Sequence, residues 1–241
     1  ELFSGLKIMD QGECYTTEMT RYPVITLSLK SSKQPDWKLA YGCLMEEISR
    51  EFIRHSTIKD TLMTEEHRRR YDDIMNLRGS MQDYITSIRF LSDCLHQYSG
   101  RKVIILIDEY DVPLENSYFG GFYNEMAGFI RSIFESALKT NPGLEFAVIT
   151  GCLRITKESI FTGLNNLEMI SILNPSYSEY FGFIQEEIDE MLMYYGLTAQ
   201  RERIREWYNG YLFGSAQVYN PWSVANYVKA LTVAPDELPV P

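Results

Sequence analysis

A run of apolar residues that ends in carboxylates is the part of this sequence best suited to chemistry. Residues 103–107 are five consecutive apolar, mostly β-branched side chains, and Asp108, Glu109 and Asp111 follow them. Such a run is typical of a strand in a parallel sheet that helices bury on both faces. Ligand sites in open α/β sheets lie at the carboxyl ends of the strands, where these acids fall. The pattern is that of a Walker B strand, in which the first acid holds Mg²⁺ and the second polarises the water that attacks a γ-phosphate.

Each acid has an expected role within this pattern. Asp108 is expected to coordinate Mg²⁺ through water, because this ion keeps much of its hydration shell. Glu109 is expected to orient and polarise the attacking water. Asp111 lies ahead of Pro113, and we interpret it as a turn stabiliser. A simpler interpretation of the whole stretch is a buried strand followed by a solvated acidic turn.

Two polar residues follow the next predicted strand. Thr150 ends that strand, where its hydroxyl can contact a γ-phosphate or cap the turn at Gly151. Arg154 lies four residues further on and can reach a phosphate as an arginine finger or form a surface ion pair. The sequence leaves both alternatives open for each residue.

Composition and charge narrow the class of protein. The chain has 241 residues, 45% hydrophobic and 23% charged, which suits one large core or a core with a small second domain. The net charge of −10 argues against a surface dominated by nucleic-acid or anionic-membrane binding. No apolar run in the sequence is long enough to cross a bilayer, and we expect no secretion signal because none is visible in these residues. The four cysteines form no Cys-x-x-Cys pair and the three histidines lack metal-ligand spacing, so we expect a cytoplasmic protein without a zinc site.

The order of the predicted elements indicates an α/β fold, a parallel P-loop NTPase-type sheet covered by helices. Four strands are expected, at residues 24–29, 103–107, 144–150 and 169–173. The segment after Pro113, rich in aromatic residues and glycine, is expected to be a loop. Residues 1–173 form the predicted core. Residues 174–233 show only short amphipathic helices, which predict a small helical lid domain, and residues 234–241 are a tail or linker.

A dense group of aromatic residues lies in the predicted lid domain. It comprises residues 207–211 and 219–222, with turn residues between the rings. A base-stacking platform is one interpretation. The acidic surroundings favour the other, a packed aromatic core of the small domain.

Several motifs, taken in chain order, resemble one family. They are residues 103–111 with Pro113, residues 150–155, residues 159–167, Tyr180-Phe181-Gly182-Phe183, Trp207-Tyr208-Asn209-Gly210-Tyr211 and Tyr219-Asn220-Pro221-Trp222-Ser223. Together they resemble the bacterial AAA-ATPase-like family, whose longer members often carry a nuclease-like domain of the PD-(D/E)XK type at the carboxyl end. The resemblance extends over about residues 1–230. It implies a P-loop fold with ATP and Mg²⁺ as ligands, and contact with nucleic acid only through a domain not present here.

The same resemblance exposes a missing element. Members of the family begin with a strand and a phosphate-binding loop of the Arg-Phe-Gly-Lys-Ser kind, but no Gly-Lys dipeptide occurs in this chain. Without the amides and lysine of that loop, no motif here can cradle a triphosphate strongly. The missing strand normally lies beside the Walker B and sensor strands, and its loss would expose two apolar strand edges. We therefore expect a truncated protein, with a naturally degenerate module as the alternative.

The sequence thus predicts an AAA-like P-loop ATPase domain. In the intact protein it binds ATP with Mg²⁺ and hydrolyses it slowly as a conformational switch, whereas the fragment is expected to be inactive. The alternative is a non-catalytic protein-interaction module with a degenerate nucleotide site. A metal site for nuclease chemistry is disfavoured, because no Asp…Glu-x-Lys arrangement follows the acids. Self-association or a partner protein is compatible with either function, and no membrane contact is expected.

Overall fold

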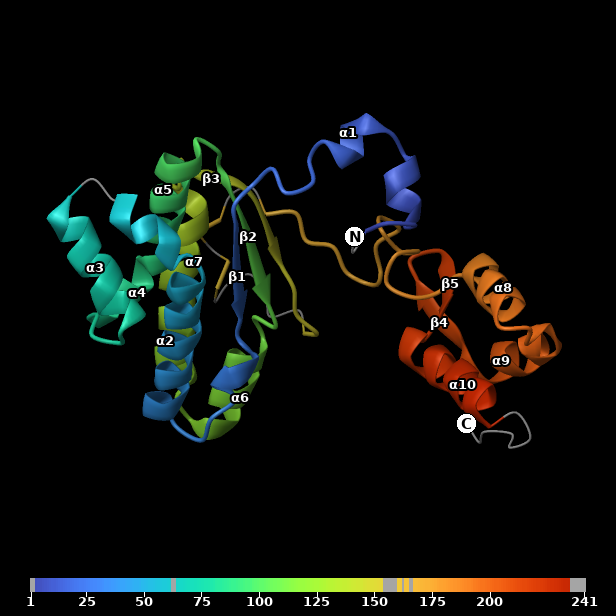
Figure 1. Ribbon diagram of the computed structural model, residues 1–241. Coiled ribbons are helices and arrows are strands. Elements are labelled where there is room, and N and C mark those ends of the chain that lie inside the picture. The colour runs from blue at the N-terminus through green and yellow to red at the C-terminus, as the bar shows by residue number, and fades with distance from the viewer. Residues whose placement is uncertain (1–2, 62–63, 154–159, 162, 165–166, 235–241) are drawn as a thin grey trace. The chain divides into compact units, whose positions relative to one another are not determined.

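A three-stranded parallel sheet forms the centre of the first of two units into which the chain divides, residues 1–167 (Figure 1). The computed structural model describes the whole chain except residues 1–2, 62–63, 154–159, 162, 165–166 and 235–241. The strands are β1 (Val24–Ser28), β2 (Val103–Asp108) and β3 (Leu144–Ile149), in the order β1-β2-β3. The predicted α/β class with a parallel sheet is therefore confirmed. Because β2 pairs with both neighbours, the acidic strand end lies in the middle of the sheet's carboxyl edge.

The strand predicted at residues 169–173 is wrong. Those residues belong to the second unit, where Ser171 and Asn174 close a turn. The Asn174 amide donates to the Ser171 carbonyl at 2.9 Å, and the Ser171 amide donates to Asn174 Oδ1 at 2.9 Å. Bonds within the turn use backbone groups that a strand would need for its neighbour, and Leu173 is left 81% exposed.

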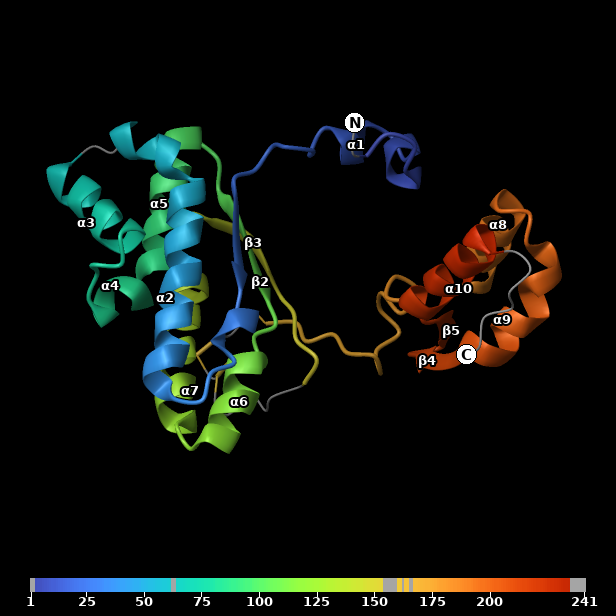
Figure 2. The same cartoon turned by 60° about the horizontal axis from the view of Figure 1, so that its bottom comes forward.

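Helices cover one face of the sheet (Figures 1 and 2). Beyond the short α1 (Glu13–Thr16), the helices of this unit are α2 (Trp37–Arg54), α3 (Glu65–Met75), α4 (Met81–Ile85), α5 (Ser87–Ser99), α6 (Val112–Gly120) and α7 (Tyr123–Phe134). Both views place α2, α5 and α7 on the same side of the strands. α2 begins at Asp36, whose side chain accepts a hydrogen bond from the Leu39 amide at 2.9 Å. Among the described residues, no helix combines the length and the apolar character needed to cross a membrane.

The segment after Pro113 is a helix, α6, and the predicted loop is wrong. Proline is tolerated in a first helical turn because its missing N–H would have no partner within the helix there. Gly121 ends the helix with a left-handed φ of +78°. A helix therefore leads directly away from the acidic strand end.

Within the first unit, no described helix covers the opposite face of the sheet. On the helix side, Ile25, Ile105 and Ile107 are at most 1% exposed, whereas on the other side Leu106 is 37% and Phe146 is 60% exposed. The prediction that β2 is buried on both faces is wrong for these residues. Apolar side chains therefore remain on a face that no described helix of the first unit covers.

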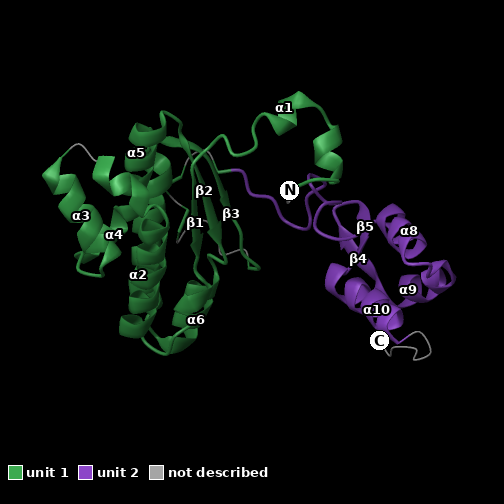
Figure 3. Cartoon of the chain, viewed as in Figure 1, with its two compact units in different colours: residues 1–167 green, residues 168–241 purple. Residues whose placement is uncertain are grey.

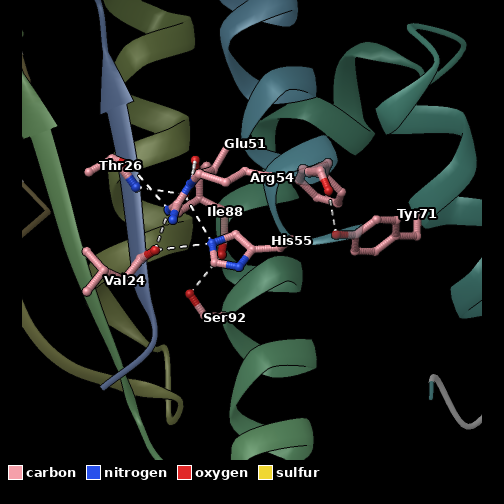
Figure 4. A network of polar contacts seen from close by, with 9 residues as sticks. Val24, Thr26, Glu51, Arg54, His55, Tyr71, Ile88 and Ser92 are labelled. Atoms are coloured by element: carbon pink, nitrogen blue, oxygen red, sulfur yellow. Dashed lines mark hydrogen bonds and ion pairs between the residues drawn. The ribbon is translucent and has the colours of Figure 1, made fainter. Parts of the chain in front are cut away.

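Side chains of α2 close the outer edge of β1 (Figure 4). The buried Glu51 carboxylate accepts a hydrogen bond from the Thr26 amide at 2.8 Å. Arg54 Nη2 donates to the Val24 carbonyl at 2.5 Å, and His55 Nε2 lies 3.1 Å from the same carbonyl oxygen. Unpaired backbone groups on an edge strand invite another strand to pair, so this network closes the edge.

The sheet therefore has one open edge, and the expectation of two exposed edges is wrong. β2 and β3 pair directly, with Ile105 opposite Ala147 and Ile107 opposite Ile149, so no strand can lie between them. The β1 edge is closed by side chains of α2. β3 is the remaining edge strand among the described residues, and its Phe146 and Val148 are exposed.

Residues 168–241 form a second unit (Figure 3). It contains α8 (Gln185–Tyr194), α9 (Arg201–Tyr208), α10 (Pro221–Val233) and a hairpin of β4 (Asn209–Phe213) and β5 (Ala216–Tyr219). The prediction that this region is purely helical is wrong, because Gly214 turns the chain at a φ of +53° and two short strands pair around it. The lid function of this unit stays a prediction.

The aromatic group of this unit is partly a core. The rings of Trp207 and Tyr208 lie 5.8 Å and 5.7 Å from that of Tyr227, which is 2% exposed. Trp222, by contrast, is 77% exposed. Tyr219 is 1% exposed and belongs to the same core, so packing accounts for Trp207, Tyr208 and Tyr219 but not for Trp222.

Removing the Glu51 carboxylate is expected to destabilise the protein. In Glu51→Ala the Thr26 amide loses its acceptor, and a buried unpaired group costs about 1–3 kcal/mol. We expect urea denaturation to show a free energy of unfolding about 2–3 kcal/mol lower than in the wild type. Glu46→Ala is the control, because Glu46 lies on the same helix and pairs with Arg50 at 3.6 Å in an exposed position. Its effect is expected to stay within about 0.5 kcal/mol, and equal effects would contradict the edge-closing role.

Acid is expected to weaken the same network. Burial alone would raise the pKa of Glu51, but hydrogen bonds from His55, Arg54 and the Thr26 amide outweigh it, so its pKa is lowered. Such a carboxyl stabilises the fold above its unfolded-state pKa of about 4.3, and this stabilisation is lost as the pH falls through the lower folded-state pKa. We expect the stability difference between the wild type and Glu51→Gln to be present at pH 5 and to shrink below about pH 4. Denaturation curves across this range test the prediction, which a difference that widens in acid would refute.

Candidate functional site

The carboxyl edge of the sheet brings Asp108 and Thr150 together. Thr150 directly follows β3, and its hydroxyl donates a hydrogen bond to Asp108 Oδ1. The Thr150 amide donates to the Ile107 carbonyl at 2.8 Å, which aligns the two strand ends. Both side chains are exposed, so a ligand can reach the pair. Two residues from strands 42 positions apart thus form one polar site.

Glu109 turns toward the other side of β2. Its Oε1 lies 4.0 Å from Nζ of Lys30, which follows β1. Its backbone is left-handed, with a φ of +56°, an arrangement that costs a non-glycine residue about 1–2 kcal/mol. Its Oε2 is buried and has no hydrogen-bond partner among the described residues. Conformations of this kind cluster at functional sites, because the surrounding structure must hold them in place.

A pocket of about 460 Å³ adjoins Glu109 on the β1 side. Lys30 and Lys33 line it, together with Phe119 and Asn116 of α6. The Asn116 side chain donates to the Gln34 carbonyl, which ties α6 to the segment after β1. Sequence reasoning missed these lysines. The usable signal was their position after the first strand, since parallel strands end at the same edge of a sheet.

Asp111 has a contact that its sequence position does not predict. It occupies the N-cap position of α6, but its side chain makes no capping hydrogen bond. It is 2% exposed, and its Oδ2 accepts a hydrogen bond from the Leu153 amide at 2.6 Å. The predicted role of turn stabiliser is therefore replaced by a bond to the segment after β3. Asp111 and Leu153 are 42 positions apart, so no local sequence pattern indicates this bond.

Arg154 lies outside the described residues. Its predicted contact with a phosphate therefore stays a prediction. The same holds for the metal role of Asp108, the catalytic role of Glu109 and the phosphate contact of Thr150, for which the structure gives positions and neighbours.

The donor atoms at the strand ends suit Mg²⁺. The Asp108 carboxylate and the Thr150 hydroxyl are hard oxygen ligands, and Mg²⁺ in nucleotide sites is bound by one or two carboxylates, water and phosphate oxygens. Within the described part of the chain, no three His, Cys, Asp or Glu side chains gather closely enough to hold a metal ion. Asp108 could hold Mg²⁺ beside a bound nucleotide, with water and phosphate oxygens as the other ligands.

Comparison with known proteins identifies the family of this chain. A family model described as a predicted AAA-ATPase, AAA-ATPase-like, matches residues 1–161. The chain belongs to this family. An uncharacterized protein in the vnfD 5' region of Azotobacter chroococcum mcd 1 is 26% identical over 224 residues, which are 92% of this chain and 39% of that relative. No solved structure matches the chain.

Membership of the AAA-ATPase-like family confirms the resemblance found in the sequence. The matched region contains Asp108, Glu109 and Thr150, and it covers most of the first unit. An ATPase family implies a nucleotide as the ligand class, with Mg²⁺ as its usual companion. Family membership gives the ligand class, and hydrolysis of ATP by this chain is a separate proposal.

Gly151 allows the two strand exits to approach. A Cβ at this position would lie 2.6 Å from Tyr110 Cε1 and 2.7 Å from Asp111 Oδ1, closer than real Cβ contacts. We expect Gly151→Ala to lower the free energy of unfolding by about 1–3 kcal/mol through overpacking. Gly128→Ala in α7 is the matched control, because no atom lies within 4 Å of that Cβ, and it is expected to stabilise the helix by about 0.5–1 kcal/mol. Chemical denaturation of both variants tests this, and a neutral Gly151→Ala would contradict the close approach.

Proposed function

We propose that the chain is the core of an ATP-dependent switch. In the intact protein it binds ATP with Mg²⁺ and hydrolyses it slowly. The hydrogen bond between the Thr150 hydroxyl and Asp108 carries the proposal, because it joins two strand ends at the edge of a parallel sheet where nucleotide sites lie. Family membership supports the same ligand class.

Each residue at the strand ends has a proposed role in hydrolysis. Asp108 would hold Mg²⁺. The Thr150 hydroxyl, which is hydrogen-bonded to Asp108, would contact the γ-phosphate. Glu109 accepts the proton of the attacking water as general base. Its carboxylate faces Lys30, so this role requires the side chain to turn toward Asp108 when nucleotide is bound. Arg154 supplies a positive charge to the phosphates.

The phosphate-binding loop is the part of the site that this chain does not supply. A strand carrying that loop can pair with β3, because the outer edge of β1 is closed by Glu51 and Arg54. It would then end beside Thr150. The exposed Phe146 on the open edge and the exposed Leu106 on the uncovered face support this position, since a strand and its following helix would cover both.

A non-catalytic interaction module is the second candidate function. The same uncovered apolar face, with Leu106, Phe146 and Val148, favours it, because exposed apolar patches mark protein–protein contacts. In that case Asp108 and Glu109 are remnants of a nucleotide site. A protein partner or a second copy would then cover the face.

Calorimetric titration of the full-length protein with Mg²⁺-ATP separates the two candidates. We expect binding in the wild type, and in Glu109→Gln we expect the same affinity with turnover reduced about 10²–10⁴-fold, the usual contribution of a general base. Asp108→Ala is expected to weaken Mg²⁺-dependent binding. Glu115→Gln is the control, because Glu115 lines the same pocket on α6 from an exposed position.

Three results would count against the assignments. Turnover that survives Glu109→Gln removes the general base, and binding that ignores Asp108→Ala removes the metal ligand. A full-length protein that binds no nucleotide favours the interaction module.

A further inference from the structure

Both backbone groups of Leu153 are held by consecutive residues at the exit of β2. The Leu153 amide donates to Asp111 Oδ2 at 2.6 Å, and the Tyr110 hydroxyl donates to the Leu153 carbonyl at 2.8 Å. Leu153 itself is 49% exposed, so the contact fastens its backbone and leaves its side chain outside. We call Tyr110, Asp111 and Leu153 the exit clamp.

The two residues that hold Leu153 are themselves fixed. Asp111 is 2% and Tyr110 is 7% exposed. The Tyr110 amide donates to the Thr150 carbonyl at 3.0 Å, and its ring packs against that of Phe161 at 5.2 Å between centroids. The exit clamp therefore grips the start and the end of the segment 150–153, and the small Gly151 between them permits the approach.

The side chain of Asp111 bonds to Leu153 and does not cap helix α6. An aspartate at an N-cap normally accepts a hydrogen bond from an amide of its own helix. Here the backbone carbonyl of Asp111 accepts from Leu114 and Glu115 at 3.1 Å and 2.9 Å, while the side chain points to the segment after β3. Its second oxygen, Oδ1, is buried without a partner among the described residues. The start of a helix does not explain a buried carboxylate oxygen without a partner, so another role is needed.

We infer that Tyr110 and Asp111 are positioning residues of the nucleotide site, an inference that rests on the proposed function. They hold the segment 150–153 to the exit of β2 and so keep the Thr150 hydroxyl beside Asp108. The run from 108 to 111 is then divided: its first two residues serve the ligand, and its last two align the neighbouring strand exit. Removal of the clamp displaces Thr150 without removing any group that contacts the nucleotide.

Kinetics of the full-length protein test this inference. Tyr110→Phe removes the hydroxyl bond to Leu153 and keeps the ring, so we expect kcat for Mg²⁺-ATP to fall about tenfold with KM changed less than about twofold, as for a misplaced reacting group. Tyr71→Phe is the matched control, because the buried Tyr71 hydroxyl also donates to a backbone carbonyl, that of Phe52, at 2.7 Å. The control is expected to keep kcat. An unchanged kcat in Tyr110→Phe overturns the inference, whereas no turnover in the wild type overturns the proposed function and the inference with it.

Hydrogen exchange supplies a readout that does not depend on activity. The Leu153 amide is expected to exchange about tenfold faster in Asp111→Ala, because its acceptor is gone. Asp111→Asn keeps a carbonyl oxygen at the same place and is expected to restore both the protection and kcat. A Leu153 amide that exchanges equally in the wild type and Asp111→Ala overturns the clamp, even if kcat falls.

Discussion

The pairing of β2 on both sides is the constraint on which the rest of this structure depends. A central parallel strand must share its backbone groups with two neighbours that run in the same direction, and β1 and β3 pair with β2 in this way. All three strands therefore end at one edge of the sheet. The pairing brings the side chains at these strand ends together, although they are far apart in the chain. Asp108 thus contacts Thr150, and Glu109 lies beside Lys30.

The two outer edges of the sheet are treated differently. At β1, a buried carboxylate, an arginine and a histidine take the place of a neighbouring strand, and the hydrogen bonds to Glu51 offset the cost of burying its charge. At β3 no such side chains are present among the described residues, and apolar groups are exposed. Because β3 is the open edge, a further strand can be added there, next to Thr150.

The side chains of residues 108–111 point to different neighbours because the backbone of Glu109 departs from the strand conformation. In a continuing strand, Glu109 and Asp111 would lie on one face of the sheet, and Asp108 and Tyr110 on the other. The left-handed φ of Glu109 stops that alternation, and Val112 begins a helix three residues later. Four consecutive residues can therefore contact three neighbours: Asp108 meets Thr150, Glu109 meets Lys30, and Tyr110 with Asp111 meet Leu153.

The sequence by itself determined the elements whose signals are local. The apolar runs of β1, β2 and β3 and the polar ends of β2 and β3 follow from side-chain periodicity, and parallel topology then places Asp108 and Thr150 at one edge. Other features escaped, such as helix α6 and the hairpin around Gly214, because their turn and helix signals compete.

Only the tertiary structure decided where the side chains of the acidic run point, what closes the β1 edge of the sheet and that the β3 edge is open. The contacts of Glu51 with Thr26, of Glu109 with Lys30 and of Asp111 with Leu153 span 25, 79 and 42 positions in sequence and join different elements. These contacts depend on the packing of α2 against β1, on one left-handed residue and on the close approach at Gly151. No local pattern of residues encodes such distances, so they are settled when the strands pair.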